Sequence, residues 1–128
     1  MIADDDAELR ATLRTLLPKE YEVLEASNGR EAVEAAAKER PGLILLDVTM
    51  PLLCGVDALA AIKAVDPAVV VIMLTSESDI ETAKEALRLG AAAYVTKPFD
   101  MEALMSEVRS TMKPEAVDRN DRPWRMKA

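Results

Sequence analysis

The stretch LILLDVTMP, residues 43–51, joins two features that together indicate the fold. Four apolar residues run directly into Asp47, and Pro51 follows four positions later. An apolar run of this length is typical of a strand buried within a parallel sheet. A carboxylate at the end of such a strand costs free energy to remove from water. We therefore expect other residues of the chain to lie near Asp47 and to offset the cost of burying its charge.

Short apolar runs alternate along the chain with segments of helical periodicity. We expect strands at residues 1–3, 22–26, 43–47, 69–74 and 92–96, and helices at 6–17, 29–39, 56–65, 79–89 and 100–112. Ser78 and Glu81 have the spacing of a capping box at the start of the fourth helix. Alternation of this kind predicts an α/β domain with a mostly parallel sheet between two layers of helices. The first strand is abbreviated, because only three residues precede a run of aspartates and a central strand normally has about five.

The composition excludes several classes of protein. A chain of 128 residues suits one domain, and its net charge of −7 argues against broad binding to a nucleic-acid backbone. The absence of histidine excludes a histidine-based triad and histidine-ligated metal. Cys54 is the only cysteine, so an internal disulfide is excluded, and we expect it to be a small, half-buried filler. No apolar run approaches the roughly 18 residues of a membrane span, so we expect a cytoplasmic protein without membrane insertion.

The alternating pattern stops at the start of residues 113–128. This segment has two prolines, five basic and three acidic residues, a net charge of +2 that leaves −9 for residues 1–112. We therefore expect one folded domain in residues 1–112 and a flexible C-terminal tail in residues 113–128. Trp124 is the feature of the tail to follow, because an exposed tryptophan is uncommon.

Polar residues follow four of the five predicted strands: Asp4, Asp5 and Asp6; Asp47; Thr75 and Ser76; and Lys97. The carboxyl ends of parallel strands meet at one edge, where ligands bind in doubly wound sheets. Carboxylates gathered there repel one another unless a cation is present, and an all-oxygen site suits Mg²⁺. Lys97 and Thr75 would then hold the oxygens of a phosphoryl group. Asp47 would be the nucleophile that accepts this group as an acyl phosphate.

Each of these residues also has a simpler explanation when taken alone. An aspartate at a strand end is usually a cap or a turn former, and a single lysine is usually solvated. The pair Thr75–Ser76 alone would be read as a helix cap, and the three aspartates as an acidic start to the first helix. Their joint occurrence at four strand ends favours chemistry at the sheet edge.

Four segments resemble motifs of the receiver domain of bacterial two-component response regulators, of the chemotaxis-regulator type. They are IADDDAELR (2–10), LILLDVTMPLLCG (43–55), VIMLTS (71–76) and AYVTKPF (93–99). The resemblance extends from residue 2 to about residue 112. It implies a flavodoxin-like (βα)5 sandwich with a five-stranded parallel sheet of order 2-1-3-4-5, and a phospho-acceptor switch rather than a turnover enzyme.

The resemblance also implies a metal-assisted phospho-acceptor site. Asp47 would accept the phosphoryl group from a phosphohistidine of a partner. Mg²⁺, or Mn²⁺, would be held by Asp4, Asp5, Asp47 and the backbone carbonyl of Thr49, with Asp5 the more direct ligand of the first pair. Thr49 and Glu77 occupy the two variable positions that tune the lifetime of the phosphate in this family.

A switch is implied by the same comparison. Thr75 would bond the phosphoryl group and draw its loop inward, and Lys97 would pair with a phosphoryl oxygen. The Lys97–Pro98 peptide bond is expected to be cis, a conformation limited almost entirely to proline. Tyr94 would change its exposure with the position of Thr75, and Gly55 would shape the turn after the proline at position 51.

The implied partners lie on both sides of this switch. The donor is a sensor histidine kinase or a histidine phosphotransfer protein, for which candidate contacts are Leu9, Arg10, Leu13, Pro98 and Phe99. Leu9 and Leu13 are equally explained as core residues, and core is favoured for Leu13. The output is a downstream protein, or a phosphorylation-dependent second copy, that reads the face formed by residues 79–89, 92–96 and 100–112. Direct binding of nucleic acid is not expected.

Three alternatives remain open. The first is a receiver-like adaptor that keeps the fold but is not phosphorylated. In this alternative, the short first strand leaves the metal site incomplete. A phosphatase of the haloacid-dehalogenase type is disfavoured because Thr49 stands where a second acid is needed, and because the chain is too short for a substrate cap. Flavin binding is disfavoured because stacking aromatics and a phosphate-binding loop are missing.

Overall fold

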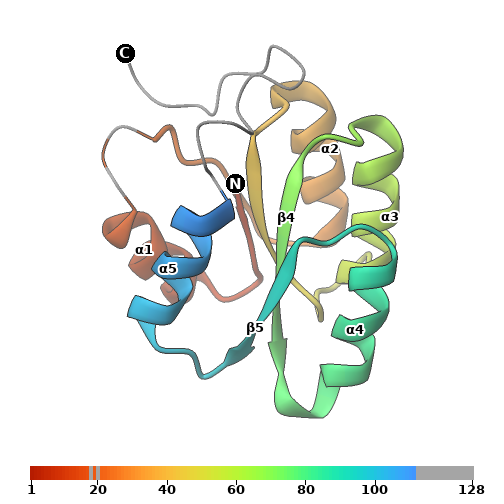
Figure 1. The fold of residues 1–128 in the computed structure, drawn as a ribbon. Helices are drawn as coiled ribbons and strands as arrows, with labels where there is room; N and C mark the ends of the chain where they lie inside the picture. Colours follow the sequence, from red (N-terminus) through yellow and green to blue (C-terminus); the bar gives the residue numbers. More distant parts are fainter. Residues whose placement is uncertain (18, 20, 112–128) are drawn as a thin grey trace.

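A parallel sheet runs through the middle of the molecule, between two layers of helices (Figure 1). The computed structural model describes residues 1–17, 19 and 21–111. Its five strands lie in the order β2-β1-β3-β4-β5, which confirms the predicted fold class and strand order. The strands are β1 (Ile2–Ala3), β2 (Glu25–Ala26), β3 (Leu43–Asp47), β4 (Val70–Ser76) and β5 (Ala93–Lys97). The first strand is abbreviated, as the sequence predicts.

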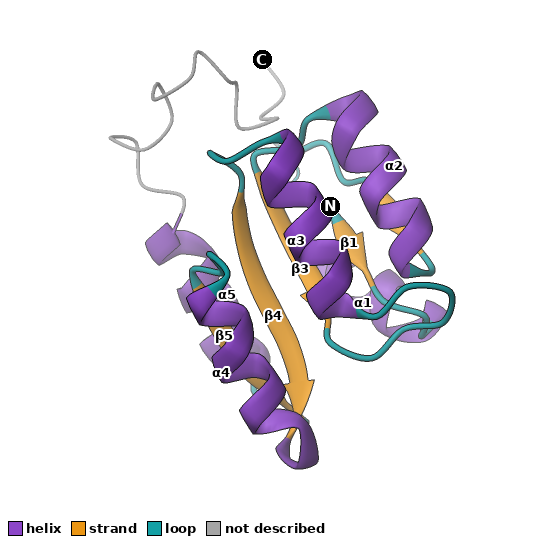
Figure 2. Cartoon of the chain, turned by 90° about the vertical axis from the view of Figure 1, so that its right-hand side faces the viewer, coloured by secondary structure: helices purple, strands orange, loops and turns teal. Residues whose placement is uncertain are grey.

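The helices divide into two layers on opposite faces of this sheet. They are α1 (Ala7–Leu16), α2 (Gly29–Glu39), α3 (Gly55–Val65), α4 (Ile80–Arg88) and α5 (Met101–Thr111), and the short turn η1 (Glu77–Asp79) precedes α4. Helices α2, α3 and α4 cover one face, which is toward the viewer in Figure 2, and α1 and α5 cover the other. Each face has its own hydrophobic core. No helix within the described ranges is both long and apolar enough to cross a membrane.

The central strand β3 shows why the sheet is predictable from apolar runs. Ile44 and Leu46 pack into the core under α2, α3 and α4, whereas Leu45 packs into the core under α1 and α5. All three are at most 2% exposed. Because both faces of a parallel sheet are covered, successive residues of its strands are all apolar. The apolar run of β3 therefore ends at the carboxyl end of the strand, at Asp47.

Several local predictions differ from the structure. The second strand is Glu25–Ala26 rather than 22–26. It pairs only with the two-residue strand β1, and this pairing begins at the hydrogen bond from the amide of Ile2 to the carbonyl of Leu24. The predicted capping box at Ser78 is wrong: Ser78 lies in the turn η1, and its hydroxyl lies 2.9 Å from that of Ser76. The tail, including Trp124, lies outside the described residues, so the boundary at residue 112 stays a prediction.

Cys54 also differs from its prediction as a half-buried filler, because its side chain is exposed. It stands at the N-cap position of α3 and makes no capping hydrogen bond with its side chain. The next residue explains the position. A Cβ on Gly55 would lie 2.1 Å from the carbonyl oxygen of Asp47, so the chain folds back tightly against the end of β3 and leaves Cys54 on the outside.

Candidate functional site

Three carboxylates meet at the carboxyl edge of the sheet. Asp4 follows β1, Asp5 is its neighbour, and Asp47 is the last residue of β3; each offers an oxygen, and these oxygens all lie within 4.8 Å of one another. Asp4 is fully buried, Asp47 is 6% exposed, and Asp5 faces solvent. The cluster thus has a buried floor of two acids and one acid open to a ligand.

Asp4 is held in place from several directions. One of its carboxylate oxygens accepts a hydrogen bond from the amide of Asp6 at 2.9 Å, and the other accepts from Lys97 at 2.8 Å. The guanidinium of Arg10 donates to the backbone carbonyl of Asp4 at 2.6 Å and also bonds Glu25 of β2 at 3.0 Å. Arg10 thus joins the start of α1 to the end of β1 and to β2. Its predicted contact with a donor stays a prediction.

The three consecutive aspartates have different roles in the structure. Asp6 is the N-cap of α1, because its carboxylate accepts from the amides of Glu8 and Leu9 at 3.0 and 3.2 Å. Such a cap satisfies amide groups that the helix itself leaves without acceptors. Asp6 therefore fixes α1, whereas Asp4 and Asp5 are left for the sheet edge.

Lys97 joins the two buried acids. Its ammonium nitrogen lies 2.8 Å from Asp4 and 3.4 Å from Asp47, and its side chain is 28% exposed. Burial of the Asp47 carboxylate, together with the charge of Asp4, raises its pKa to about 6, although Lys97 and the amide of Thr49 act in the opposite direction. Burial alone would lower the pKa of Lys97, but its contacts with Asp4 and Asp47 outweigh burial and raise it.

The cluster carries more negative than positive charge, so a bound cation would stabilise it. One lysine faces three aspartates, so the group carries a formal charge of −2 when all are ionised. The pKa of Asp47 is raised because its carboxylate is buried and lies near the charge of Asp4, and the positive charge of Lys97 does not fully offset these two effects. Three carboxylate oxygens at this spacing, one of them open to solvent, fit a hard divalent cation such as Mg²⁺.

The loop after β3 bends sharply around Asp47. The amide of Thr49 approaches the Asp47 carboxylate at 3.4 Å, and the amide of Gly55 donates to the carbonyl of Val48 at 2.7 Å. Leu52 stands at φ 70, a left-handed conformation that is unfavourable for a side-chain-bearing residue, and it is 71% exposed. The tightness of the loop thus fixes Asp47 at the cost of local strain at its tip.

The predicted switch residues lie on the two neighbouring strands. Thr75 is buried at the end of β4, and its hydroxyl donates to the carbonyl of Ser76 at 3.2 Å. In register, Thr75 lies beside Thr96 and Ser76 beside Lys97. Tyr94 is half-buried and packs against the core under α2, α3 and α4. Their switching roles stay predictions, as does the role of the exposed Glu77 in phosphate lifetime.

The remaining predicted residues are placed as follows. The Lys97–Pro98 peptide bond is cis, as the resemblance implies. Leu13 is fully buried, in line with the preference for core, and Leu9 and Phe99 are half-buried against the same core. Pro98 is exposed next to Lys97. Contact of any of these with a donor stays a prediction.

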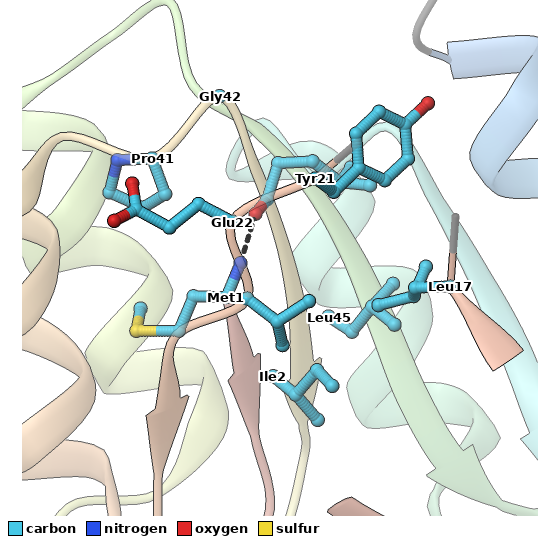
Figure 3. A pocket seen from close by; sticks show the side chains of 10 residues that line it. Met1, Ile2, Leu17, Tyr21, Glu22, Pro41, Gly42 and Leu45 are labelled. Atoms are coloured by element: carbon cyan, nitrogen blue, oxygen red, sulfur yellow. Dashed lines mark hydrogen bonds between the residues drawn. The ribbon is translucent and has the colours of Figure 1, made fainter. Parts of the chain in front are cut away.

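A separate hollow lies at the opposite edge of the sheet, at the amino ends of β1 and β3 (Figure 3). Met1, Leu17, Tyr21 and Leu45 are among its mainly apolar lining, and the nitrogen of Met1 donates to the carbonyl of Leu43 at 2.7 Å. The hollow contains none of the residues of the acidic cluster. The chemistry of the described part of the domain therefore gathers at the carboxyl edge.

Fold and site together define a class: a doubly wound parallel domain whose buried strand-end aspartate stands among acids, a lysine and a threonine. The sequence pattern of the response regulator receiver domain matches residues 1–109, and the chain belongs to this family.

Two curated relatives and one solved structure illustrate the similarity. The chemotaxis protein CheY of Halobacterium salinarum is 36% identical over 113 residues, covering 88% of this chain and 94% of the relative. Sporulation initiation phosphotransferase F of Bacillus subtilis is 34% identical over 110 residues, covering 85% and 89%. A CheY-like receiver domain of Methanospirillum hungatei has a TM-score of 0.81 at 27% identity, covering 86% of this chain and 89% of that one. Other relatives are longer regulators, of which the chain spans between 27% and 54%.

Proposed function

We propose that the chain is a phospho-acceptor switch in which Asp47 receives a phosphoryl group from a partner phosphohistidine. Response regulators receive such groups from histidine kinases and act on downstream targets, as switches rather than turnover enzymes. The observation that supports this role most directly is the position of Lys97 between two buried acids, at 2.8 Å from Asp4 and 3.4 Å from Asp47. That ammonium is placed to pair with a phosphoryl oxygen once Asp47 is modified.

In the proposed transfer, a carboxylate oxygen of Asp47 attacks the phosphorus of the phosphohistidine. The new phosphorus–oxygen bond forms as the phosphorus–nitrogen bond breaks, and the imidazole of the donor leaves with the electron pair. The attack requires two anionic groups to approach each other. Mg²⁺ held by Asp4, Asp5, Asp47 and the carbonyl of Thr49 would supply positive charge that reduces this repulsion. Mn²⁺ would serve in the same way.

Phosphorylation would then change the local charge by roughly −1.5 to −2, according to the ionisation of the phosphate. Lys97 would turn from Asp4 toward the phosphoryl oxygens, and the Thr75 hydroxyl would exchange the carbonyl of Ser76 for the same group. Tyr94, which lies beside Met73 of β4, two residues before Thr75, would follow. The face formed by α4, β5 and α5 would thus shift between two populations, one of which binds a downstream protein or a second copy.

The test is the mass of the intact protein after incubation with acetyl phosphate and Mg²⁺. We expect a gain of one phosphoryl group in the wild type, and none in Asp47→Asn or without Mg²⁺. Asp57→Asn is the matched control, because Asp57 is an exposed acid at the start of α3, and it should be modified normally. Modification of Asp47→Asn would contradict the assignment of the acceptor.

The same experiment separates the alternatives. A folded wild-type protein that gains no mass would favour a non-phosphorylated adaptor. Continued release of phosphate from a phosphomonoester would favour a phosphatase, whereas a single addition per chain favours a switch. The cytoplasmic location, the absence of nucleic-acid binding, the histidine phosphotransfer donor and the lifetime-tuning roles of Thr49 and Glu77 stay predictions beside this proposal.

A further inference from the structure

A chain of hydroxyl groups and one carboxylate connects the two loops that border the Asp47 site. One carboxylate oxygen of Asp79 accepts from the hydroxyl of Thr49 at 3.2 Å and from the hydroxyl of Ser76 at 3.0 Å. The hydroxyl of Ser78 lies 2.9 Å from that of Ser76. Because Ser76 has one hydroxyl hydrogen and donates it to Asp79, Ser78 is the donor in this last pair. The contacts join residues 30 positions apart in the sequence.

Asp79 is not explained by the helix that it precedes. It stands at the N-cap position of α4, where an aspartate normally accepts from amides of the first turn. Its side chain makes no such capping bond, and its backbone lies at φ −108 and ψ 18. The carboxylate faces the two loops instead. The helix start thus gives up a stabilising contact, and the carboxylate is used to join Thr49 to Ser76.

Both loops carry residues of the proposed switch. Thr49 follows Asp47 by two positions, and Ser76 follows Thr75 directly. The Thr75 hydroxyl donates to the backbone carbonyl of Ser76, so the residue that Asp79 holds is also the acceptor for Thr75. A movement of the Thr75 loop toward a phosphorylated Asp47 would carry Ser76 with it, because the two residues are adjacent. The bridge through Asp79 opposes that movement.

We propose that Asp79 is a positioning residue, whose bonds to Thr49 and Ser76 hold the loop of Thr75 in the arrangement of the unphosphorylated domain. The inference rests on the proposed function and adds a residue that sets how readily the switch moves. The bridge is a latch: it must open, at least in part, when the phosphoryl group recruits the Thr75 hydroxyl. Loss of the latch should therefore favour the phosphorylated arrangement.

The test is a titration with beryllium fluoride, a phosphoryl mimic, in the presence of Mg²⁺, followed by calorimetry and by the amide signals of Thr75 and Ser76. Asp79→Ala removes both bonds of the bridge and should lower the half-saturating concentration at least about five-fold, the factor that corresponds to one hydrogen bond of ordinary net strength. Asp79→Asn retains an acceptor oxygen without the charge, so its effect should be smaller. Mg²⁺ alone should bind all three proteins equally.

Glu81→Ala is the matched control for charge. Glu81 is an exposed acid two residues further on, and its carboxylate lies 3.4 Å from the ammonium of Lys84, on the same helix. It should leave the beryllium fluoride titration unchanged. An effect equal to that of Asp79→Ala would show that net charge is responsible, and the latch would be refuted.

A second cycle uses Thr49→Val, which removes the hydroxyl and preserves the shape of the side chain. Thr49→Val should also tighten binding. The double variant with Asp79→Ala should bind no tighter than Asp79→Ala alone, because Asp79→Ala has already removed the contact that Thr49→Val removes. Additive effects, or weaker binding in either single variant, would overturn the latch. If Asp79→Ala does not fold, Asp79→Asn and Thr49→Val carry the test. A folded wild type that binds neither Mg²⁺ nor beryllium fluoride would overturn the proposed function itself, and the latch with it.

Discussion

The two sides of the Asp47 site are built from different kinds of contact. On one side, Asp4 and Asp47 are buried and joined by the ammonium of Lys97. On the other, Thr49 and Asp79 meet through an exposed hydroxyl–carboxylate contact beside the loop that carries Leu52. Buried charges are costly to separate, whereas exposed hydrogen bonds contribute little net free energy. We call the side with Asp4 and Lys97 the fixed side, because it holds the acceptor. We call the side with Thr49 and Asp79 the mobile side, because we expect it to move on phosphorylation.

The largest effect is expected where the fixed side meets the loop, at Gly55. A Cβ there would lie 2.1 Å from the backbone oxygen of Asp47 and 2.7 Å from the Cα of Val48, and neither atom belongs to a flexible side chain. We expect Gly55→Ala to lower the free energy of unfolding by about 4 kcal/mol or to prevent folding. Urea unfolding followed by circular dichroism measures this.

A glycine at an open position provides the contrast for Gly55→Ala. Gly90 is exposed, and only the flexible side chain of Lys63 lies near its missing Cβ, but its φ of 111 makes alanine strained there as well. We therefore expect Gly90→Ala to cost about 1 kcal/mol, the usual scale for such backbone strain. Equal costs for the two variants would mean that the close approach at Gly55 relaxes easily, and that Asp47 is less firmly fixed than its surroundings indicate.

The second prediction concerns pH on the buried side. The pKa of Asp47 rises from 3.8 to about 6 on folding, so in the absence of metal the folded domain holds this proton over a pH range where the unfolded chain releases it. The contribution of Asp47 to stability is therefore most favourable below about pH 4 and declines until about pH 6, above which it is constant. By neutral pH the decline amounts to at most about 3 kcal/mol.

Asp47→Asn removes this dependence. We expect the variant to gain stability relative to the wild type as pH rises from 4 to 6, and to be the more stable protein at neutral pH without metal. Unfolding midpoints measured in chelator across this range test the sign. A wild type that gains stability relative to Asp47→Asn over the same range would mean that Lys97 outweighs burial and Asp4.

The third prediction tests the open acid of the cluster. Asp5 faces solvent, so Asp5→Ala should change the stability of the metal-free domain little. In the wild type, Mg²⁺ at ten times its dissociation constant should stabilise the fold by about 1.4 kcal/mol, because it binds only the folded cluster. Asp5→Ala should lose this increment in a melt with and without Mg²⁺. Asp57→Ala, an exposed acid on α3, should retain it, and a full increment in Asp5→Ala would exclude Asp5 as a ligand.

The fixed side could be predicted from the sequence to a larger extent than the mobile side. The strand 43–47 was predicted at its observed bounds, because burial on both faces leaves a continuous apolar run that ends at Asp47. The convergence of Asp4, Asp47 and Lys97 followed from the rule that strand ends meet at one edge.

The mobile side could not be predicted in the same way. Asp79 was not recognised, because its partner Thr49 lies 30 residues away and neither residue interrupts a periodic pattern. The pattern instead suggested a capping box at Ser78, since local spacing favours the nearest helix start. Cys54 was misplaced for a similar reason: its exposure depends on the close approach of Gly55 to β3, which composition does not reveal.

The smallest expected effect lies at the tip of the mobile side, at Leu52. Its φ of 70 is a left-handed conformation that costs a leucine about 1 kcal/mol, and asparagine tolerates it better. Because Leu52 is 71% exposed, its replacement gives up little burial. Leu52→Asn should therefore stabilise the domain by about 0.5 kcal/mol or more. The same change at Leu87, which is 39% exposed within α4, should destabilise it, because asparagine is a poorer helix former than leucine. Opposite signs in urea unfolding would locate the strain at the backbone of Leu52; a loss in both variants would mean that Leu52 contributes packing that outweighs its strain.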